Sequence, residues 1–424
     1  MGCGTFWTRD CAPVTEMLQQ HPGELGFDPD RLERARGLLQ QAIAQGAFPG
    51  AVALVARRGR VAAHWALGEA QVDPTRRPMQ PDTVFDLASL TKAVAGATAA
   101  LLLLEDGAWS LDDAVARFMP EFAAHGKQEV TLRHLLTHTA GFAGWVPTYT
   151  RASDPEAVVR VICDLKLGDA PGTVVRYSDI GMSLIGHLVR RVTGEGIDRL
   201  LLSRVWMPLG MRDTGFNPQG TQRERAAATE RGNRFEQAMV ANLGETFGGW
   251  RDGVLVGEVN DGNTHYPLGG VSSHAGLFST VADLFIFCQM YLDGGVSNGR
   301  RIFSSGTIAE ATADQTIGLA QSWGLGWQLL KKGRQPREEW APSPAATKIF
   351  PPQRYAFPVP RPFGDLLSGA TYGHTGFTGT SAAIDPKRDL IIILLTNRTH
   401  PDADNFAINY IRPRFHNLVA AAVL

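Results

Sequence analysis

Apolar residues recur at helical spacing early in the chain, and two apolar runs of strand length follow them. Asp28 precedes Pro29, and apolar side chains then repeat every three or four positions. An acidic cap followed by proline at the first helical position starts a helix, which the later Phe-Pro-Gly sequence ends. The runs 51–56 and 61–66 flank a tight polar turn, so they predict an antiparallel hairpin.

Helical periodicity dominates the middle of the chain, whereas the last hundred residues return to strand-like runs. The predicted helices cover residues 132–138, 155–165, 180–192, 281–292 and about 404–422. The predicted strands cover residues 322–331, 370–376, 381–384 and 390–395. Strands that open and close the chain around a helical middle predict an α+β fold, in which helices flank a sheet built from both chain ends.

This order of elements predicts a division of the chain into three parts. They are an N-terminal extension (1–26), an α/β domain made of two segments (27–87 and 317–424), and an inserted, mostly helical domain (88–316). A cleft where the two domains meet is the expected functional site. Two segments lack clear periodicity, 217–267 and the Pro-rich 333–364; each either forms a lid or wall of that site or is disordered.

Composition and charge limit the classes of function. The 424 residues are 44% hydrophobic and 20% charged, and 41 basic against 42 acidic residues leave no basic field for nucleic acid. Four scattered cysteines and the absence of a nucleotide-binding glycine motif imply no metal and no cofactor. The longest apolar run, 93–104, is too short for a membrane span and predicts a buried helix. The first ten residues lack an apolar signal core, which favours a cytoplasmic protein. The oligomeric state stays open.

Candidate chemistry begins with Ser89 and Lys92, at the head of that apolar helix. Residues three apart share one face of a helix, so the spacing places a hydroxyl beside an amine. This is the arrangement of an activated serine nucleophile. Of the seven lysines, Lys92 is the one with a serine three positions before it. Taken alone, the pair also fits a capping serine followed by a surface lysine.

Two further motifs place polar groups at the ends of predicted elements. Tyr177-Ser178-Asp179 lies on a loop that leads into a helix, where the phenol can project. His374-Thr375-Gly376 ends a predicted strand, and a glycine there lets another backbone approach closely.

Together these motifs resemble a known superfamily, which comprises the class C serine β-lactamases, the penicillin-binding proteins and the family VIII carboxylesterases. Those proteins carry Ser-x-x-Lys, Tyr-x-Asn and Lys-Thr-Gly, with His-Thr-Gly common in the esterase branch. Here Ser89-Leu90-Thr91-Lys92, Tyr177-Ser178-Asp179 and His374-Thr375-Gly376 follow in the same order and rough spacing. Residues 135–141 and 323–327 also resemble stretches common in that superfamily. The resemblance covers about residues 27–424 and implies the β-lactamase/transpeptidase-like fold.

The resemblance also implies roles for individual residues. Ser89 is the nucleophile that becomes acylated, Lys92 lies one turn behind it, and Tyr177 is the base for acylation and for the attacking water. The N–H groups of Ser89 and Phe377 form the oxyanion hole, and Thr375 and Gly376 support the substrate. Because a cation nearby favours a phenolate, the protons of Lys92 and Tyr177 leave as a coupled pair, and sequence does not assign the resting base.

Two residues depart from the β-lactamase pattern. Asp179 replaces the usual asparagine, and an ionised carboxylate accepts hydrogen bonds but donates none. It either pairs with Lys92, keeping the amine charged and leaving Tyr177 as the base, or caps the following helix. His374 replaces lysine, and a neutral imidazole lacks the fixed positive charge that binds a carboxylate. That replacement favours neutral esters over β-lactams and peptide C-termini.

Three other patterns imitate functional motifs. Ser297 lies in a Gly-x-Ser-x-Gly sequence, but a helix precedes it where α/β-hydrolases need a strand, so we expect a helix C-cap and turn. His134 and His138 are four apart without the glutamate of a zinc protease, and we expect buried, hydrogen-bonded histidines. The segment around His274 precedes a helix and is expected to cap it, with a place in the cleft as the alternative.

The sequence therefore predicts a cofactor-free serine hydrolase that cleaves small, short-chain carboxylic esters through an acyl-enzyme. A β-lactamase, D-Ala-D-Ala carboxypeptidase or amidase using the same three residues is the alternative. A second alternative is an inactive relative that binds peptidoglycan or serves as a scaffold. The intact Ser89, Lys92 and Tyr177 argue against that last possibility.

Overall fold

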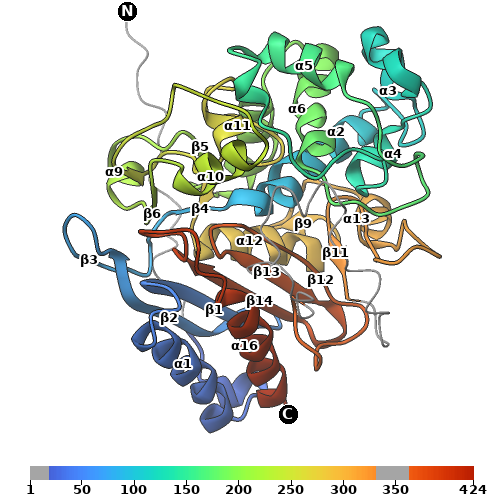
Figure 1. Cartoon of the computed structure of the whole chain (residues 1–424). Helices are drawn as coiled ribbons and strands as arrows, with labels where there is room; N and C mark the ends of the chain where they lie inside the picture. The colour runs from blue at the N-terminus through green and yellow to red at the C-terminus, as the bar shows by residue number, and fades with distance from the viewer. Residues whose placement is uncertain (1–18, 331–361) are drawn as a thin grey trace, which may run out of the picture.

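A seven-stranded antiparallel sheet forms the centre of the protein in a computed structural model, which describes residues 19–330 and 362–424 (Figure 1). The strand order is β11-β12-β13-β14-β1-β2-β3. Its strands are β1 (Gly50–Arg57), β2 (Arg60–Gln71), β3 (Arg77–Pro78), β11 (Gln328–Leu329), β12 (Tyr372–Thr375), β13 (Ser381–Asp385) and β14 (Leu390–Thr396). β1 pairs with β14 from Ala51 opposite Thr396 to Arg57 opposite Leu390. The sheet is thus built from both chain ends, which confirms the predicted α+β fold.

Helices cover both faces of this sheet, and the side chains of β1 show how. Successive residues of a strand point to opposite faces. Val52 and Leu54 belong to one apolar cluster with α12 (Val281–Leu292), whereas Ala53 and Val55 belong to a second cluster with α1 and α16. A strand buried on both faces is apolar throughout, which explains the uninterrupted run in the sequence.

The two helices of the second cluster come from opposite ends of the chain. α1 (Pro29–Ala44) begins as predicted, because the Asp28 carboxylate accepts a hydrogen bond of 3.1 Å from the Arg31 N–H. It packs beside α16 (Ile408–Ala422), and the two lie together below the sheet in Figure 1.

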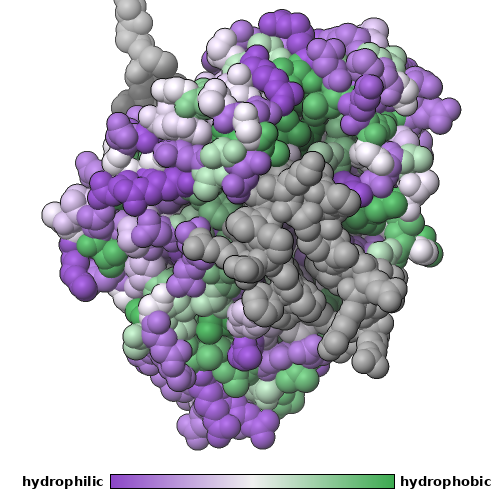
Figure 2. All heavy atoms as spheres, in the orientation of Figure 1, coloured by the Kyte–Doolittle hydropathy of each residue, from purple (hydrophilic) through white to green (hydrophobic). Residues whose placement is uncertain are grey.

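The remaining elements lie mostly on the other side of the sheet, in the upper half of Figure 1. The helices are α2 (Thr98–Glu105), α3 (Val115–Phe118), α4 (Leu132–Leu136), α5 (Pro155–Asp164), α6 (Asp179–Thr193), α7 (Ile197–Leu201), α8 (Met207–Leu209), α9 (Gly220–Glu224), α10 (Arg234–Asn242), α11 (Gly262–His265) and α13 (Ser305–Thr312). The short strands are β4 (Phe85–Asp86), β5 (Gly215–Phe216), β6 (Ala228–Arg231), β7 (Val254–Val256), β8 (Leu277–Ser279), β9 (Val296–Ser297) and β10 (Arg300–Arg301). One apolar cluster is shared by many of these helices, α12 and the sheet. On the face shown in Figure 2, hydrophilic residues dominate the periphery.

The apolar segment that carries Ser89 and Lys92 forms a buried helix. It starts with a 3-10 turn at Ala88–Leu90, continues as a π-helix over Lys92–Ala97 and ends as α2. Ala88–Glu105 therefore exceeds the run seen in the sequence and has the length and composition of a membrane span. However, 83% of this window is buried inside the protein, as in the core helix of a globular fold.

Two predicted elements differ in the structure. The strand expected over 322–331 is reduced to β11 within the described residues, because the Gly324 N–H donates to the Trp327 carbonyl at 2.8 Å and closes a turn. The segment 217–267 is an ordered wall that contains α10, β7 and α11. Most of the segment 333–364 lies outside the described residues.

Candidate active site

A cavity of about 460 Å³ opens between the sheet edge and the helical region, which is the size of a small-molecule site. Several parts of the chain contribute to it: the start of the Ser89 helix, the loop before α6, α10, the loop before α11, the strand β12 and the helix α16. Its lining includes Ser89, Trp145, Tyr177, Asp179, Phe235, Glu236, Asn260, Asp261, His274, Trp323, His374, Thr375, Gly376, Phe377, Arg398, Asn409 and Arg412. Lys92 lies directly behind this lining, because its ammonium contacts Ser89.

The buried ammonium of Lys92 brings three segments together. Its Nζ donates to Ser89 Oγ at 2.9 Å and to the His274 carbonyl at 3.1 Å, and it lies 2.6 Å from Asp179 Oδ1. An ammonium has three N–H donors, and these three oxygens provide one acceptor for each of them. The side chain of Lys92 is 0% exposed. Because Ser89 Oγ accepts from Lys92, its own proton is free for a base.

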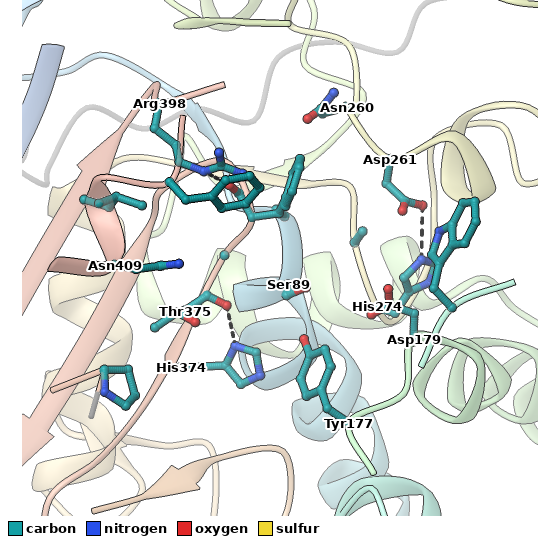
Figure 3. Close-up of a pocket in the computed structure, with 18 of the residues that line it drawn as sticks. Ser89, Tyr177, Asp179, Asn260, Asp261, His274, His374, Thr375, Arg398 and Asn409 are labelled. Carbon is teal, nitrogen blue, oxygen red and sulfur yellow. Dashed lines mark hydrogen bonds and ion pairs between the residues drawn. The ribbon is translucent and has the colours of Figure 1, made fainter. Parts of the chain in front are cut away.

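Tyr177 places a phenol beside this pair. Its ring lies over the Lys92 ammonium, with the ring centroid 4.9 Å from Nζ, and Figure 3 shows its hydroxyl directed toward Ser89. Burial raises the pKa of the Tyr177 phenol, although Lys92 and Ser89 act in the opposite direction. Burial lowers the pKa of Lys92, but Asp179 and Tyr177 outweigh it and hold this pKa above its ordinary value. The resting site therefore contains an ammonium and a phenol.

Asp179 is the counter-ion of Lys92 and does not cap the helix that follows it. Ser178 caps α6, since its hydroxyl accepts from the Gly181 N–H at 3.3 Å. The structure therefore separates the two roles that the sequence left open. The pairing with Lys92 is present, and the capping is performed by the preceding residue.

Three rings surround Tyr177. The ring centroids of His138, Trp323 and His374 lie 4.5, 5.8 and 6.0 Å from that of Tyr177. Burial and the nearby Lys92 hold the pKa of His138 well below its ordinary value, and its Nδ1 accepts from the Ser178 N–H at 3.2 Å. The sequence predicts a buried histidine at this position but no part for it in the site. The signal was available, since His138 lies in the stretch 135–141 that carries part of the resemblance.

His374 lies on β12 with an uncharged ring. Burial lowers the pKa of this imidazole to about 3, with Lys92 acting in the same direction. Its Nδ1 lies 2.8 Å from the Thr375 carbonyl, and its Nε2 has no hydrogen-bond partner within the described part of the chain. The position that carries a fixed positive charge in β-lactamases is thus neutral here.

The backbone turn before Ser89 is held in an unusual conformation. Ala88 has a φ of +46°, which is costly for a residue with a Cβ. The buried Asp86 stabilises this turn, since its carboxylate accepts from the N–H groups of Ala88 at 2.8 Å and Asn260 at 2.7 Å. Burial raises the pKa of Asp86 to about 6.

The strand end that carries Phe377 is fixed to this same turn. The Thr378 hydroxyl donates to the Asp86 carbonyl at 2.7 Å, and the Thr380 hydroxyl donates to the Leu87 carbonyl at 2.9 Å. Gly376 lies against Leu87 so closely that no Cβ would fit. Ser89 and Phe377 consequently both line the cavity.

His274 lines the cavity, which corrects the expectation that its segment caps a helix. Its Nδ1 lies 2.7 Å from Ser272 Oγ, and its Nε2 lies 3.1 Å from Asp261 Oδ1. The next helix, α12, is capped by Thr280 instead. The local sequence did not distinguish the two possibilities, because Ser-Ser-His is compatible both with a helix cap and with a hydrogen-bonded imidazole in a cavity wall.

The other two sequence patterns that resemble functional motifs, around Ser297 and His134, lie outside this site. Ser297 is on β9 of a two-stranded hairpin and does not line the cavity. His134 belongs to the capping box of α4 with Thr131. In the described ranges, no cluster of histidine, cysteine, aspartate or glutamate is arranged to hold a metal ion.

Comparisons with known proteins agree with the class that this fold and site define, a serine hydrolase with a Ser-x-x-Lys nucleophile. A family model described as Beta-lactamase matches residues 35–413, and the chain belongs to this family. A protein of Escherichia coli (strain K12) named "Putative D-alanyl-D-alanine carboxypeptidase" is 30% identical over 411 residues, which cover 92% of this chain and 87% of that protein.

Solved structures share the fold. A penicillin-binding protein homologue from Caulobacter crescentus has a TM-score of 0.66 at 23% identity and covers 92% of this chain and 98% of its own. EstCE1, described as a hydrolase with promiscuous acyltransferase activity, has a TM-score of 0.63 at 22% identity, covering 93% and 98%. A class C β-lactamase from Rhodobacter sphaeroides has a TM-score of 0.62 at 21% identity, covering 89% and 97%.

The charge of Asp179 should set the pH dependence of the site. Its negative charge raises the pKa values of both Lys92 and Tyr177, and the pair must lose a proton before either acts as a base. In Asp179→Asn both pKa values fall, so the rising limb of kcat/KM should move to lower pH. The measurement is a pH–rate profile of both proteins on one substrate, and an unmoved limb would contradict this role.

Gly376 should be intolerant of a side chain. A Cβ would overlap the Thr380 hydroxyl and the Leu87 carbonyl, and would push Phe377 away from Ser89. We expect Gly376→Ala to lower kcat about 100-fold, the effect of losing one oxyanion donor. Gly37→Ala is the control, since a Cβ on that helical glycine meets nothing within 4 Å. Equal kcat values for both variants would show that the close approach is dispensable.

Proposed function

We propose that the protein hydrolyses carboxylic esters through an acyl-enzyme on Ser89. The observation that carries this proposal is that Ser89 and Tyr177 line one cavity and both lie against the buried ammonium of Lys92. Once the Lys92–Tyr177 pair has lost a proton, the phenolate oxygen takes the Ser89 proton while Oγ attacks the ester carbonyl carbon. The N–H groups of Ser89 and Phe377 stabilise the resulting oxyanion.

The second half of the reaction uses the same groups in reverse order. The C–O bond to the alcohol breaks, and the leaving oxygen takes the proton from Tyr177. A water then attacks the acyl carbon and gives a proton to Tyr177. The bond between Ser89 Oγ and the acyl carbon breaks, Oγ takes that proton from Tyr177, and the carboxylic acid leaves. Throughout, the Lys92–Tyr177 pair exchanges one proton with the reacting atoms.

Two features of the cavity support esters as substrates. The neutral His374 provides no fixed positive charge for the carboxylate of a β-lactam. Trp145, Phe235 and Phe377 contribute apolar surface on which an acyl chain can pack. The likeness to EstCE1 is consistent with this chemistry but shows the fold alone.

The proposal predicts ester hydrolysis that depends on Ser89. A panel of nitrophenyl esters of rising chain length should be hydrolysed, and a fluorophosphonate should add to the protein once per chain, because both report the same activated hydroxyl. Ser89→Ala should abolish both, to at least a 1000-fold loss of kcat, the order seen for triad nucleophiles. Ser297→Ala is the matched control, since that serine lies in the hairpin outside the cavity. Labelling retained in Ser89→Ala would exclude Ser89 as the nucleophile.

A second candidate, D-Ala-D-Ala carboxypeptidase activity, is favoured by Arg412. This guanidinium lines the cavity and is 4% exposed, and its one hydrogen bond within the described residues, to the Thr380 carbonyl, is 3.4 Å long. Its Nε has no partner, and among the described residues no carboxylate pairs with it. Burial lowers the pKa of Arg412 to about 10, so it is still charged at neutral pH. A buried cation without a counter-ion suits a substrate carboxylate.

Arg412 should therefore separate the two candidates. If the substrate is a peptide ending in D-Ala-D-Ala, Arg412→Gln should lower kcat/KM for that peptide about 10- to 100-fold relative to a neutral ester, the range for a lost charged hydrogen bond. Arg414→Gln is the control, since Arg414 is exposed on the same helix and bonds only to the Tyr410 carbonyl. A wild-type protein that hydrolyses the ester but not the peptide would eliminate the second candidate.

A further inference from the structure

Tyr177 reaches the cavity from a stretch of chain, 174–178, that forms neither helix nor strand. The helix α6 begins only at Asp179. Regular backbone hydrogen bonds therefore do not fix the direction of the phenol, yet Figure 3 shows its hydroxyl directed toward Ser89. Contacts with other parts of the chain must hold the phenol there, because a base works only within hydrogen-bond reach of the proton that it takes.

A single residue, His138, bonds to the N–H groups of the residues on both sides of Tyr177. The Arg176 N–H donates to the His138 carbonyl at 2.8 Å, and the Ser178 N–H donates to His138 Nδ1 at 3.2 Å. The His138 ring also packs on the phenol, with the ring centroids 4.5 Å apart and the ring planes 38° from parallel. The backbone and the ring of His138 thus contact Tyr177 and both of its neighbours.

The conformation of His138 is unusual for a residue that only fills the core. Its φ is +59°, in the left-handed region where a side chain is strained. Such strain persists only where the surroundings enforce it. The imidazole is buried and packs against Trp323 as well, with the ring centroids 4.5 Å apart. His138 is nevertheless not among the described residues that line the cavity, so it acts on the site only through its neighbours.

The hydrogen bond from Ser178 also fixes the protonation state of the imidazole. A ring nitrogen that accepts from an N–H carries no proton, so the single proton of the neutral ring is on Nε2. A protonated ring would place one N–H against another and a second positive charge close to Lys92. Burial and Lys92 accordingly keep the pKa of His138 well below its ordinary value. At neutral pH, Nδ1 is therefore available as an acceptor.

We propose that His138 is a positioning residue for Tyr177, and that it acts through the acceptor Nδ1. Without this acceptor the Ser178 N–H loses its bond, and the irregular stretch before α6 is free to carry the phenol away from Ser89. A shift of about 1 Å in a reacting group can lower a rate about 100-fold. This inference rests on the proposed function, because it concerns the transfer of the Ser89 proton.

Two substitutions separate the acceptor from the conformation. Asparagine and glycine both tolerate a left-handed φ, but only asparagine carries an acceptor, Oδ1, in the place of Nδ1. His138→Gly should lower kcat about 100-fold and change KM by less than about threefold, since the cavity lining is intact. His138→Asn should keep kcat within about tenfold of the wild-type value, which is the range for one weakened hydrogen bond. Similar losses of about 100-fold in both variants would overturn the role of the acceptor.

The matched control is His134→Asn. It alters a histidine of the neighbouring α4 capping box, outside the cavity, and should leave kcat unchanged. If His138→Gly does not fold, His138→Asn still decides, because a loss of kcat of about 100-fold in that variant would overturn the proposal.

Hydrogen exchange at the Ser178 amide tests the contact without turnover, read by mass spectrometry of peptide fragments. Exchange should be similar in wild-type protein and His138→Asn, and at least about tenfold faster in His138→Gly, where the acceptor is lost. Unchanged exchange in His138→Gly would overturn the proposal. Absence of ester hydrolysis and of fluorophosphonate labelling in wild-type protein would reject the proposed function, while the exchange rates still decide whether His138 holds this segment.

Discussion

The fully buried ammonium of Lys92 is the constraint on which the site depends. Moving a charged group of this size out of water costs several kcal/mol, and that cost is offset only when good partners surround it. Its partners come from three separate parts of the chain: Ser89 on the same helix, Asp179 at the start of α6, and the carbonyl of His274. Displacing any one segment leaves the charge poorly compensated. The requirement to stabilise this ammonium therefore also aligns the nucleophile.

The surroundings of Tyr177 follow from the same charge. A second cation near Lys92 would raise the energy of the ammonium, and both nearby imidazoles are held neutral by burial and by Lys92 itself. His138 and His374 can thus pack against the phenol as uncharged rings. Charged groups lie farther out on the cavity walls, with Asp261 on one part and Arg412 on another. The cavity therefore combines one buried ammonium at its centre with charges of both signs on its walls.

The sequence predicted correctly those elements that are determined by residues close together in the chain. The Asp28 cap and the helical period after it were sufficient for α1, and the spacing of Ser89 and Lys92 was sufficient to place them side by side. The strand expected over 322–331 was too long, because Gly324 and Gly326 interrupt the apolar run and Gly326 adopts the positive φ of a turn. Asn260, Asp261 and Arg412 reach the cavity only through the fold, and no sequence motif marks them. The resemblance predicted which three motifs meet at the site. The residues that line the rest of the cavity could be identified only from the fold.

The pairing of β1 with β14 has a consequence for how this protein is made. β1 ends at Arg57, but the strand beside it is completed only at Thr396, so more than three hundred residues separate the two halves of one ladder. Contacts this distant in sequence are slow to form, because the intervening chain must be ordered first. During synthesis β1 can pair with β2 early, but its other edge stays without a partner until β14 has left the ribosome. The segment that bears Phe377 is made equally late, so a nascent chain contains Ser89 long before it contains Phe377, which lines the same cavity.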